Sequence, residues 1–335
     1  MKYLLIDTAN MFFRARHVAF RASDPWEKVG YALHITFTAI NKVYRQFDAD
    51  HVVFCLEGRS WRKDFYEPYK KNRAVARAAL TEKEQEEEQL FWETFDEFTK
   101  YLRERTNCSV LRHENAEADD LIARWIDLHK DDEHTIISSD TDFVQLIANN
   151  VQQYNGITDE LITHEGIFNS KGDRVIDKKT KEPKAIPDPQ WLLFEKCMRG
   201  DSSDNVFSAY PGVRKKGTKN KVGLLEAFAN RGTKGYNWNN MMLQRWTDHN
   251  GAEHRVLDDY NRNVALIDLT AQPQDIKDSV DLAIIGQIDH KDIGQVGSHF
   301  LKFCGKYDLN KISESANQFG QWLNKTYSGV LDGNS

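Results

Sequence analysis

The sequence has few cysteines and no long hydrophobic run. Its 335 residues include four cysteines, which are far apart and form no C-x-x-C pair, and this argues against a disulfide framework or a thiolate zinc site. No stretch reaches the roughly 18 apolar residues of a membrane span, and the N-terminal apolar run ends at Asp7, too early for a signal peptide. We therefore expect a cytoplasmic protein with reduced thiols and no membrane contact.

The sequence also lacks the net positive charge that is typical of nucleic-acid-binding proteins. Lysine and arginine number 45 against 51 acidic residues, so the formal net charge is −6. The charges are unevenly distributed, however: residues 59–77 are basic with interleaved aromatics, 82–88 are strongly acidic, and 212–221 are basic again. Because such local clusters decide binding more than the sum does, a nucleic-acid partner stays open.

Three short apolar runs each lead into an acidic residue. The runs are residues 3–6, 52–56 and 135–137, and the acids that follow them are Asp7, Glu57 and Asp140. Continuous apolarity is typical of strands that are buried on both faces, and amphipathic helical patterns lie between the runs. We predict an α/β fold with a mostly parallel central sheet and helices on both faces. Ligands of such folds bind outside the carboxyl ends of the strands, where these acids should meet.

Paired acids are the most informative feature of the sequence. The set comprises Asp7, Glu57, Glu117, Asp119, Asp120, Asp140, Asp142, Asp201 and Asp204. Any one of them could be a helix cap or a solvated surface residue, and Ser139 or Thr141 could cap the helix after 140. Two carboxylates about 4 Å apart repel by roughly 4 kcal/mol at an effective dielectric of 20, so a cluster of them needs cations. Oxygen ligands without histidine or cysteine select Mg²⁺ or Mn²⁺, and a pair of such ions is a device for phosphodiester hydrolysis.

Five short segments, in order along the chain, carry a family resemblance. They are Ile6-Asp7 followed by Asn10, Tyr69-Lys70-Lys71-Asn72-Arg73, Glu117-Ala118-Asp119-Asp120, Ser139-Asp140-Thr141-Asp142-Phe143 and Gly200-Asp201-Ser202-Ser203-Asp204-Asn205. Together they resemble the motifs of the flap-endonuclease (5′-nuclease) family. The phage-encoded RNase H (5′–3′ exonuclease) branch is the most similar, because residues 61–65 and 260–268 also resemble its segments. The resemblance spans about residues 1–270.

The resemblance implies a role for each acid. Asp7, Glu57, Glu117 and Asp119 would hold one Mg²⁺, which Mn²⁺ could replace. Asp140, Asp142 and Asp204 would hold a second ion, with Asp120 and Asp201 nearby or bridging through water. The family usually has aspartate where Glu57 stands, so the longer side chain is expected to bind through water or directly.

The resemblance also implies two basic regions that bind nucleic acid. Lys70 and Arg73 would contact the scissile phosphate beneath a helical arch, where Tyr69, Lys71 and Arg62 would bind DNA. A helix-hairpin-helix-type loop would bind the duplex backbone through Arg214, Lys215, Lys216, Gly217 and Lys219. Lysines replace a glycine and an apolar residue of the usual loop, so a monovalent-ion site there is not expected. The acidic run 82–88 could repel duplex or be an exposed helix face.

The resemblance divides the chain into two predicted regions. Residues 1–185 would form the α/β core, with a protruding helical arch insertion at about 59–110. Residues 186–335 would be helical, with the helix-hairpin-helix-type loop at about 204–229 and further helices behind it.

The predicted function is a structure-specific 5′-nuclease of DNA replication, with exonuclease, flap endonuclease and RNA-primer-removing activity. Its substrate would be branched, nicked or RNA-primed duplex with a free 5′ end. We expect a monomer in a cell's cytoplasm (the host's, for a phage protein), where a single-strand-binding protein or a sliding clamp would be its partner. Two alternatives stay open: a PIN-type endoribonuclease, whose domains are usually far shorter, and an inactive replication-fork binding protein.

Overall fold

The protein forms two compact units, each with its own core. The computed structural model describes residues 1–18, 24–210, 223–248, 250–288 and 291–331. The first unit combines Met1–Ser60, Leu80–Ile186 and Gln274–Ser335, and the second combines Trp61–Ala79 and Pro187–Pro273. The predicted boundary at 185–186 lies close to one of these divisions, but residues from Gln274 onwards pack with the first unit.

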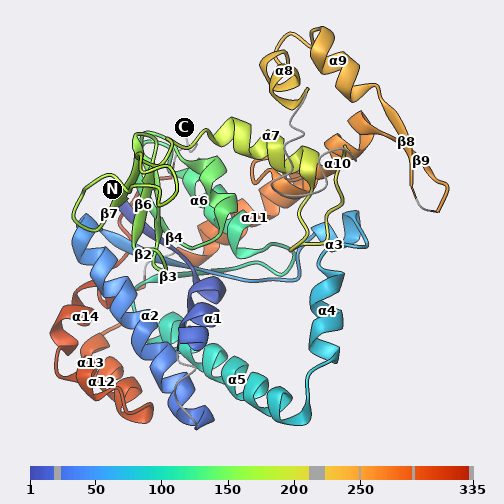
Figure 1. Cartoon of the computed structure of the whole chain (residues 1–335). Coiled ribbons are helices and arrows are strands. Elements are labelled where there is room, and N and C mark those ends of the chain that lie inside the picture. Colours follow the sequence, from blue (N-terminus) through green and yellow to red (C-terminus); the bar gives the residue numbers. More distant parts are fainter. Residues whose placement is uncertain (19–23, 211–222, 249, 289–290, 332–335) are drawn as a thin grey trace. The chain divides into compact units, whose positions relative to one another are not determined.

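A seven-stranded sheet organises the first unit (Figure 1). Its strand order is β3-β2-β1-β4-β5-β6-β7. The first five strands in this order are parallel to one another, whereas β6 pairs antiparallel with β5 and β7 pairs antiparallel with β6. The strands are β1 (Lys2–Asp7), β2 (His51–Leu56), β3 (Ser109–Arg112), β4 (Glu133–Ile137), β5 (Val151–Asn155), β6 (Glu160–Thr163) and β7 (Gly166–Asn169). The predicted mostly parallel α/β sheet is confirmed.

The register of the central strands brings their carboxyl ends level. Asp7, the last residue of β1, pairs with Cys55 of β2, and Ile6 pairs with Ile137, the last residue of β4. β2 is buried along its whole length, as its unbroken apolar run predicts. The residues that directly follow β2 and β4 therefore lie beside Asp7 at one edge of the sheet.

Helices cover both faces of this sheet. One face carries α6 (Ala118–Leu128), which packs on β1, β2 and β3, and α11 (Gln274–Gln287), which packs on α6 and β3. The other face carries α1 (Thr8–Val18), α2 (Pro25–Phe47), α5 (Glu82–Arg105), α12 (Val296–Lys306), α13 (Asn310–Ser313) and α14 (Ala316–Leu323). The α2 helix begins at Pro25, because the Asp24 carboxylate accepts from the Glu27 amide and proline suits the first turn of a helix.

The α5 helix differs from the protruding element that the sequence predicts. Phe91, Phe95, Phe98 and Leu102 recur every three or four residues and therefore share one face of the helix. All four are buried in the core of the first unit. The second half of the expected insertion is thus a core helix, and its apolar stripe packs against the unit's own interior.

The acidic run at the start of α5 has cationic partners in the same unit. Glu88 pairs with Arg16 of α1, and the Glu87 carboxylate lies 2.8 Å from the Lys28 ammonium of α2. Glu84 accepts hydrogen bonds from the backbone amide and hydroxyl of Thr81 at the start of the helix. These contacts favour the interpretation of the run as an ordinary helix face that docks on α1 and α2.

The second unit is mainly helical. It contains α3 (Arg62–Phe65), α4 (Lys71–Ala78), α7 (Pro189–Arg199), α8 (Leu224–Ala229), α9 (Tyr236–Met242) and α10 (Val256–Ile267), with a hairpin of β8 (Arg245–Thr247) and β9 (Glu253–Arg255). The α7 helix starts at Pro189, because the Asp188 carboxylate accepts from the Trp191 amide. Phe194, Met198 and Leu224 belong to its buried core.

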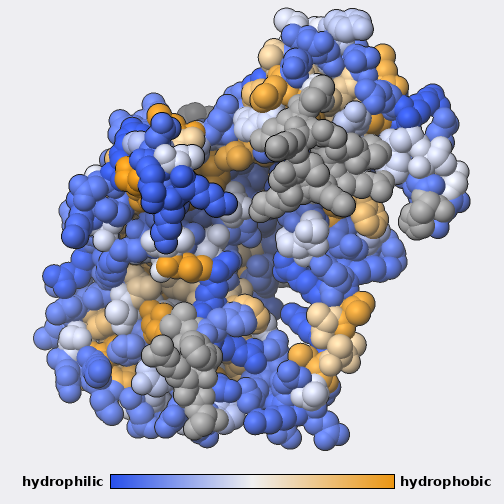
Figure 2. Space-filling view, in the orientation of Figure 1, coloured by the Kyte–Doolittle hydropathy of each residue, from blue (hydrophilic) through white to orange (hydrophobic). Residues whose placement is uncertain are grey.

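The visible surface is dominated by hydrophilic residues, and apolar ones form scattered patches (Figure 2). Among the helices of the described ranges, none is long and apolar enough to cross a membrane.

Candidate metal centre

Asp7 lies buried at the carboxyl end of β1, and neutral groups hold both of its carboxylate oxygens. The Ser138 hydroxyl donates to Oδ2 at 2.9 Å, and the Asn10 backbone amide donates to Oδ1 at 3.3 Å. Only 6% of Asp7 is exposed. These two hydrogen bonds orient the side chain, and neither donor carries a charge.

Glu57 and Glu117 are brought together by two joined loops. The Gly58 amide donates to the Ala116 carbonyl at 2.9 Å, and the Arg59 amide donates to the Glu114 carbonyl at 2.7 Å. A Cβ added to Gly58 would lie 2.0 Å from the His113 carbonyl oxygen, so the loops can approach this closely only because residue 58 is glycine. One Glu57 oxygen accepts from the Ala118 amide at 3.3 Å, at the start of α6.

Glu117, Asp119 and Asp120 form the tightest acidic group. Each offers a carboxylate oxygen, and these oxygens all lie within 4.8 Å of one another. The Ser60 hydroxyl donates to Glu117 at 2.8 Å, while the Glu117 and Asp120 backbone amides donate to Asp120 and Asp119. A group of carboxylate oxygens this close together suits a hard divalent cation such as Mg²⁺ or Mn²⁺.

Asp140 and Asp142 stand just beyond β4, on the short 3-10 helix η2 (Thr141–Leu146). Asp140 itself caps this helix, since its Oδ1 accepts from the Asp142 amide at 3.0 Å. The prediction that Ser139 or Thr141 would be the cap is therefore wrong. Ser139 instead donates its hydroxyl to the Asn10 side chain at 3.0 Å, because Asn10 faces it from the start of α1.

The Cys55 thiol is buried beside Asp7 and Glu57. Burial raises the pKa of this thiol well above its usual value, and the charges of Asp7 and Glu57 raise it further. All four cysteines are buried and free. A thiol that stays protonated does not compete with the carboxylates for a metal ion.

In the second unit, Asp201 is held by a cation and by its own loop. Burial alone would raise the pKa of Asp201, but the Lys196 ammonium at 2.7 Å and hydrogen bonds from Ser203 lower it below its usual value. The loop turns back because Gly200 adopts a φ of +75°, where a Cβ would lie 2.4 Å from the Val206 carbonyl oxygen. Its predicted role near a metal stays a prediction.

Asp204 gathers the predicted phosphate-contacting residues around it. Its Oδ1 lies 2.6 Å from the Arg73 guanidinium, and its Oδ2 lies 3.7 Å from the Lys70 ammonium. The Tyr69 hydroxyl also donates to Oδ2, at 3.2 Å. The Asn72 amide donates to the carbonyls of residues 202 and 203. Two motifs that lie far apart in the sequence thus form one hydrogen-bonded group, and the predicted share of Asp204 in a second metal ion stays a prediction.

The other predicted DNA-binding residues differ in their surroundings. Arg62 is 1% exposed and donates to the Leu266 carbonyl at 2.8 Å, so it packs within the second unit, and its predicted DNA contact stays a prediction. Tyr69 is also buried, whereas Lys71 is exposed and pairs with Glu67 on the same helical turn. The predictions for Arg214, Lys215, Lys216, Gly217 and Lys219 lie outside the described residues.

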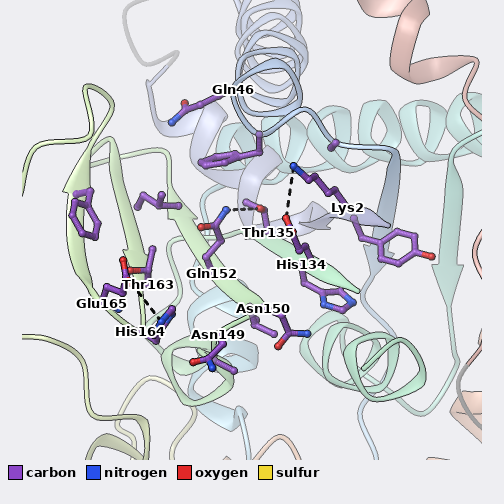
Figure 3. Close-up of a pocket in the computed structure, with 18 residues that line it drawn as sticks. Lys2, Gln46, His134, Thr135, Asn149, Asn150, Gln152, Thr163, His164 and Glu165 are labelled. Carbon is purple, nitrogen blue, oxygen red and sulfur yellow. Dashed lines mark hydrogen bonds and ion pairs between the residues drawn. The ribbon is translucent and has the colours of Figure 1, made fainter. Parts of the chain in front are cut away.

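A cavity of about 540 Å³ lies at the opposite end of the strands from the acids. It is lined by residues at the amino ends of β1, β4 and β5, including Lys2, Thr135 and Gln152 (Figure 3). The Gln152 amide donates to the Thr135 hydroxyl at 2.9 Å. None of the predicted metal-site acids lines this cavity.

Ser60, Ser138 and Gln153 are site residues that the sequence did not reveal. Each donates hydrogen bonds to an acid or to the backbone beside one. Ser138 carried the clearest signal, because it directly follows a buried strand and stands two residues before Asp140.

A family model described as the 5′–3′ exonuclease N-terminal resolvase-like domain matches residues 2–172. A 5′–3′ exonuclease of Mycoplasmopsis pulmonis is 28% identical over 222 residues, which are 65% of this chain and 65% of that protein. The flap endonuclease Xni of Shewanella loihica is 27% identical over 232 residues, which are 68% of this chain and 77% of that protein.

The fold has counterparts among solved structures. The zinc-bound T5 5′-exonuclease matches with a TM-score of 0.60 at 19% identity, over 86% of this chain and 99% of that one. This likeness shows a shared fold. The chain spans less than two thirds of the length of the Mycoplasmopsis pulmonis relative, 65%.

Proposed function

The chain belongs to the 5′–3′ exonuclease family, and from this premise we propose that it is a divalent-metal-dependent, structure-specific 5′-nuclease. The observation that carries the proposal is the carboxylate group at the carboxyl edge of the first unit's sheet. Glu117, Asp119 and Asp120 offer oxygens within 4.8 Å of one another, and Asp7 and Glu57 follow the neighbouring strands. Such a group needs a cation to offset its mutual repulsion.

We propose that Asp7, Glu57, Glu117 and Asp119 hold one Mg²⁺ ion and that Asp140 and Asp142 hold a second. Bound in this way, the ions would supply an activated water and stabilise the leaving oxygen. The residues of the chain orient these ligands: Ser138 and Asn10 hold Asp7, Ser60 holds Glu117, and the Gly58 loop fixes Glu57. Mn²⁺ would replace Mg²⁺ because both prefer oxygen ligands.

Lys70 and Arg73 are the proposed contacts to the scissile phosphate. Both are cations near Asp204, and their charges are held in place by hydrogen bonds and ion pairs before any substrate arrives. Preorganised charge of this kind stabilises the negative charge that builds on a phosphoryl group in the transition state.

The proposed substrates are nucleic acids with a free 5′ end, including flaps, nicks and RNA-primed duplex. Contacts of this kind go to the backbone and do not read base sequence. In replication such an enzyme would remove RNA primers in the cytoplasm, next to a single-strand-binding protein or a sliding clamp.

The decisive experiment uses 5′-labelled flap, nicked and RNA-primed duplexes with Mg²⁺, Mn²⁺ or excess EDTA. We expect cleavage near the 5′ end with either metal and none with EDTA. Full cleavage in EDTA would refute the mechanism. Cleavage restricted to single-stranded RNA would instead favour the PIN-type endoribonuclease, and binding without cleavage would favour an inactive fork-binding protein.

A further inference from the structure

Ser138 connects two of the acids that end neighbouring strands. It directly follows β4, and only 3% of it is exposed. Its hydroxyl donates to Asp7 Oδ2 at 2.9 Å and accepts from the Asp140 backbone amide at 3.1 Å. One oxygen atom thus joins the last residue of β1 to the loop that carries Asp140 and Asp142.

Gln153 of β5 holds this loop from the other side. Its side-chain amide donates to the Ser138 carbonyl at 3.0 Å and to the Asp140 carbonyl at 2.6 Å. Gln153 is 1% exposed, so these hydrogen bonds are shielded from water. The backbone on both sides of the Ser138 hydroxyl is therefore fixed, and the hydroxyl has a defined direction.

Asn10 completes a second link between the same two strand ends. Its backbone amide donates to Asp7 Oδ1 at 3.3 Å, and its side-chain oxygen accepts from the Ser139 hydroxyl at 3.0 Å. Asp7 consequently has a partner on each carboxylate oxygen, and each partner leads to the end of β4. The Asn10 contact orients Asp7 through the backbone, whereas Ser138 does so through a side chain that substitution can remove.

We propose that Ser138 is a positioning residue that couples Asp7 to the Asp140–Asp142 loop and so sets the separation of the two groups of metal ligands. The inference rests on the proposed metal binding, and it adds a residue that touches no metal in that scheme. A carboxylate that is held by hydrogen bonds presents its free lone pairs in a fixed direction. Loss of such supporting contacts typically weakens metal binding about 10- to 100-fold.

The test compares metal binding by the intact chain and by Ser138→Ala. Mn²⁺ alone is titrated calorimetrically into each protein in the absence of nucleic acid. We expect Ser138→Ala to bind Mn²⁺ about 10- to 100-fold more weakly than the wild type. Ser109→Ala is the matched control, because Ser109 is equally buried at 3% but opens β3 at the amino end of the sheet. It should bind Mn²⁺ like the wild type.

A second pair of variants separates the effect of the hydroxyl group from the effect of side-chain volume. Threonine and valine have the same shape and differ only in the hydroxyl group. Ser138→Thr should bind Mn²⁺ close to the wild-type affinity, and Ser138→Val should be as weak as Ser138→Ala. This comparison decides the question even where Ser138→Ala unfolds, and a thermal unfolding scan checks that both members of the pair are folded.

The outcomes separate this inference from the proposed function. Equal Mn²⁺ affinity of Ser138→Thr and Ser138→Val, in a protein that binds Mn²⁺ and cleaves flaps, overturns the role of Ser138 alone. A wild-type protein that binds no Mn²⁺ overturns both. Weak binding by Ser138→Val with near-normal binding by Ser138→Thr supports the coupling.

Discussion

The contacts described above for the predicted metal-site acids differ between the two units. In the first unit, Asp7, Glu57 and Glu117 accept hydrogen bonds from serine hydroxyls and backbone amides. In the second, Asp201 pairs with Lys196, and Asp204 pairs with Lys70 and Arg73. Neutral donors orient a carboxylate without cancelling its charge, whereas a lysine or an arginine offsets it.

This difference separates two uses of the same residue type. The serine hydroxyls and backbone amides that contact the first unit's acids add no positive charge of their own, so these contacts do not reduce attraction for a divalent cation. In the second unit, Asp204 instead helps to fix the positions of Lys70 and Arg73, which are the proposed phosphate contacts. Residue type alone would have assigned all nine predicted acids to one task.

The largest expected effect comes from neutralising an acid of the first unit. Asp119→Asn removes one charge from the tightest group and should lower the single-turnover cleavage rate about 10³-fold, roughly 4 kcal/mol of transition-state stabilisation. DNA affinity should stay the same or rise, because repulsion of phosphates decreases. The measurement is cleavage of a labelled flap at saturating enzyme.

The control for this variant is Asp281→Asn, which removes an acid of the same unit that pairs with Arg124 at 2.7 Å. It should cleave at the wild-type rate. A normal rate for Asp119→Asn would remove the basis for distinguishing the two kinds of acid.

As the pH falls, the first unit should lose stability before the second. Burial lowers the pKa of His51 and of His134 to about 4, so both are neutral when folded and take up protons more readily when unfolded. Their contribution to the free energy of unfolding is fully present above the unfolded pKa of about 6.5. It is lost as the pH falls towards 4, by up to about 3 kcal/mol for each histidine. The lowered pKa of Asp201 also stabilises the folded state at neutral pH. This contribution is lost only as the pH falls below the unfolded pKa of about 4.

Hydrogen exchange resolved by peptide, corrected for intrinsic rates, measures the loosening of each unit between pH 7 and pH 4. His134→Phe should reduce the pH dependence of hydrogen exchange in the first unit, because it removes one titrating group from a buried position 5.6 Å from the Tyr3 ring. Earlier loosening of the second unit would contradict this order.

Arg73→Ala should lower the saturated single-turnover rate about 10²-fold, as is expected when a preorganised charge contact is lost. Arg73→Lys should recover only part of the rate, because lysine cannot reproduce the planar guanidinium. Arg77→Ala is the matched control from the same helix, α4, and should be nearly normal. Equal losses at positions 73 and 77 would show a general charge effect and not a placed contact.

The smallest effect is expected from the acidic run of α5. Glu87→Gln with Glu88→Gln removes two partly exposed ion pairs and should lower the free energy of unfolding by about 1 kcal/mol or less. The preference between flapped and nicked substrates should not change. Increased cleavage of nicked duplex, both by this variant and by Glu82→Gln with Glu86→Gln in the same run, would instead show that the run excludes duplex.

The sequence predicted the sheet because its strands are unbroken apolar runs and their ends are marked by acids. The antiparallel β6–β7 extension escaped prediction, since its strands are short and only half-buried. The core position of α5 was missed for a different reason. An apolar stripe such as Phe91 to Leu102 shows that a helix is amphipathic but does not show what it packs against.

The sequence predicts the acids of the candidate site but not the residues that hold those acids in place. Glu117 and Asp120 are found from spacing, whereas a serine such as Ser60 has no signature that separates it from other serines. Its role depends on a backbone at φ +71° that the sequence does not display. Arg62 shows a related limit, because the sequence marks it as a basic motif residue but does not show that it is buried.

Position 58 carries a consequence for how this protein can vary. Any side chain there, even a methyl group, would collide with carbonyl oxygens of His113, Glu114 and Ala116 and push apart the loops that carry Glu57 and Glu117. A saturation library selected for nuclease activity should therefore recover glycine alone at this codon. The neighbouring codon 57 should tolerate both aspartate and glutamate, so a position that accepts substitution would directly precede one that does not.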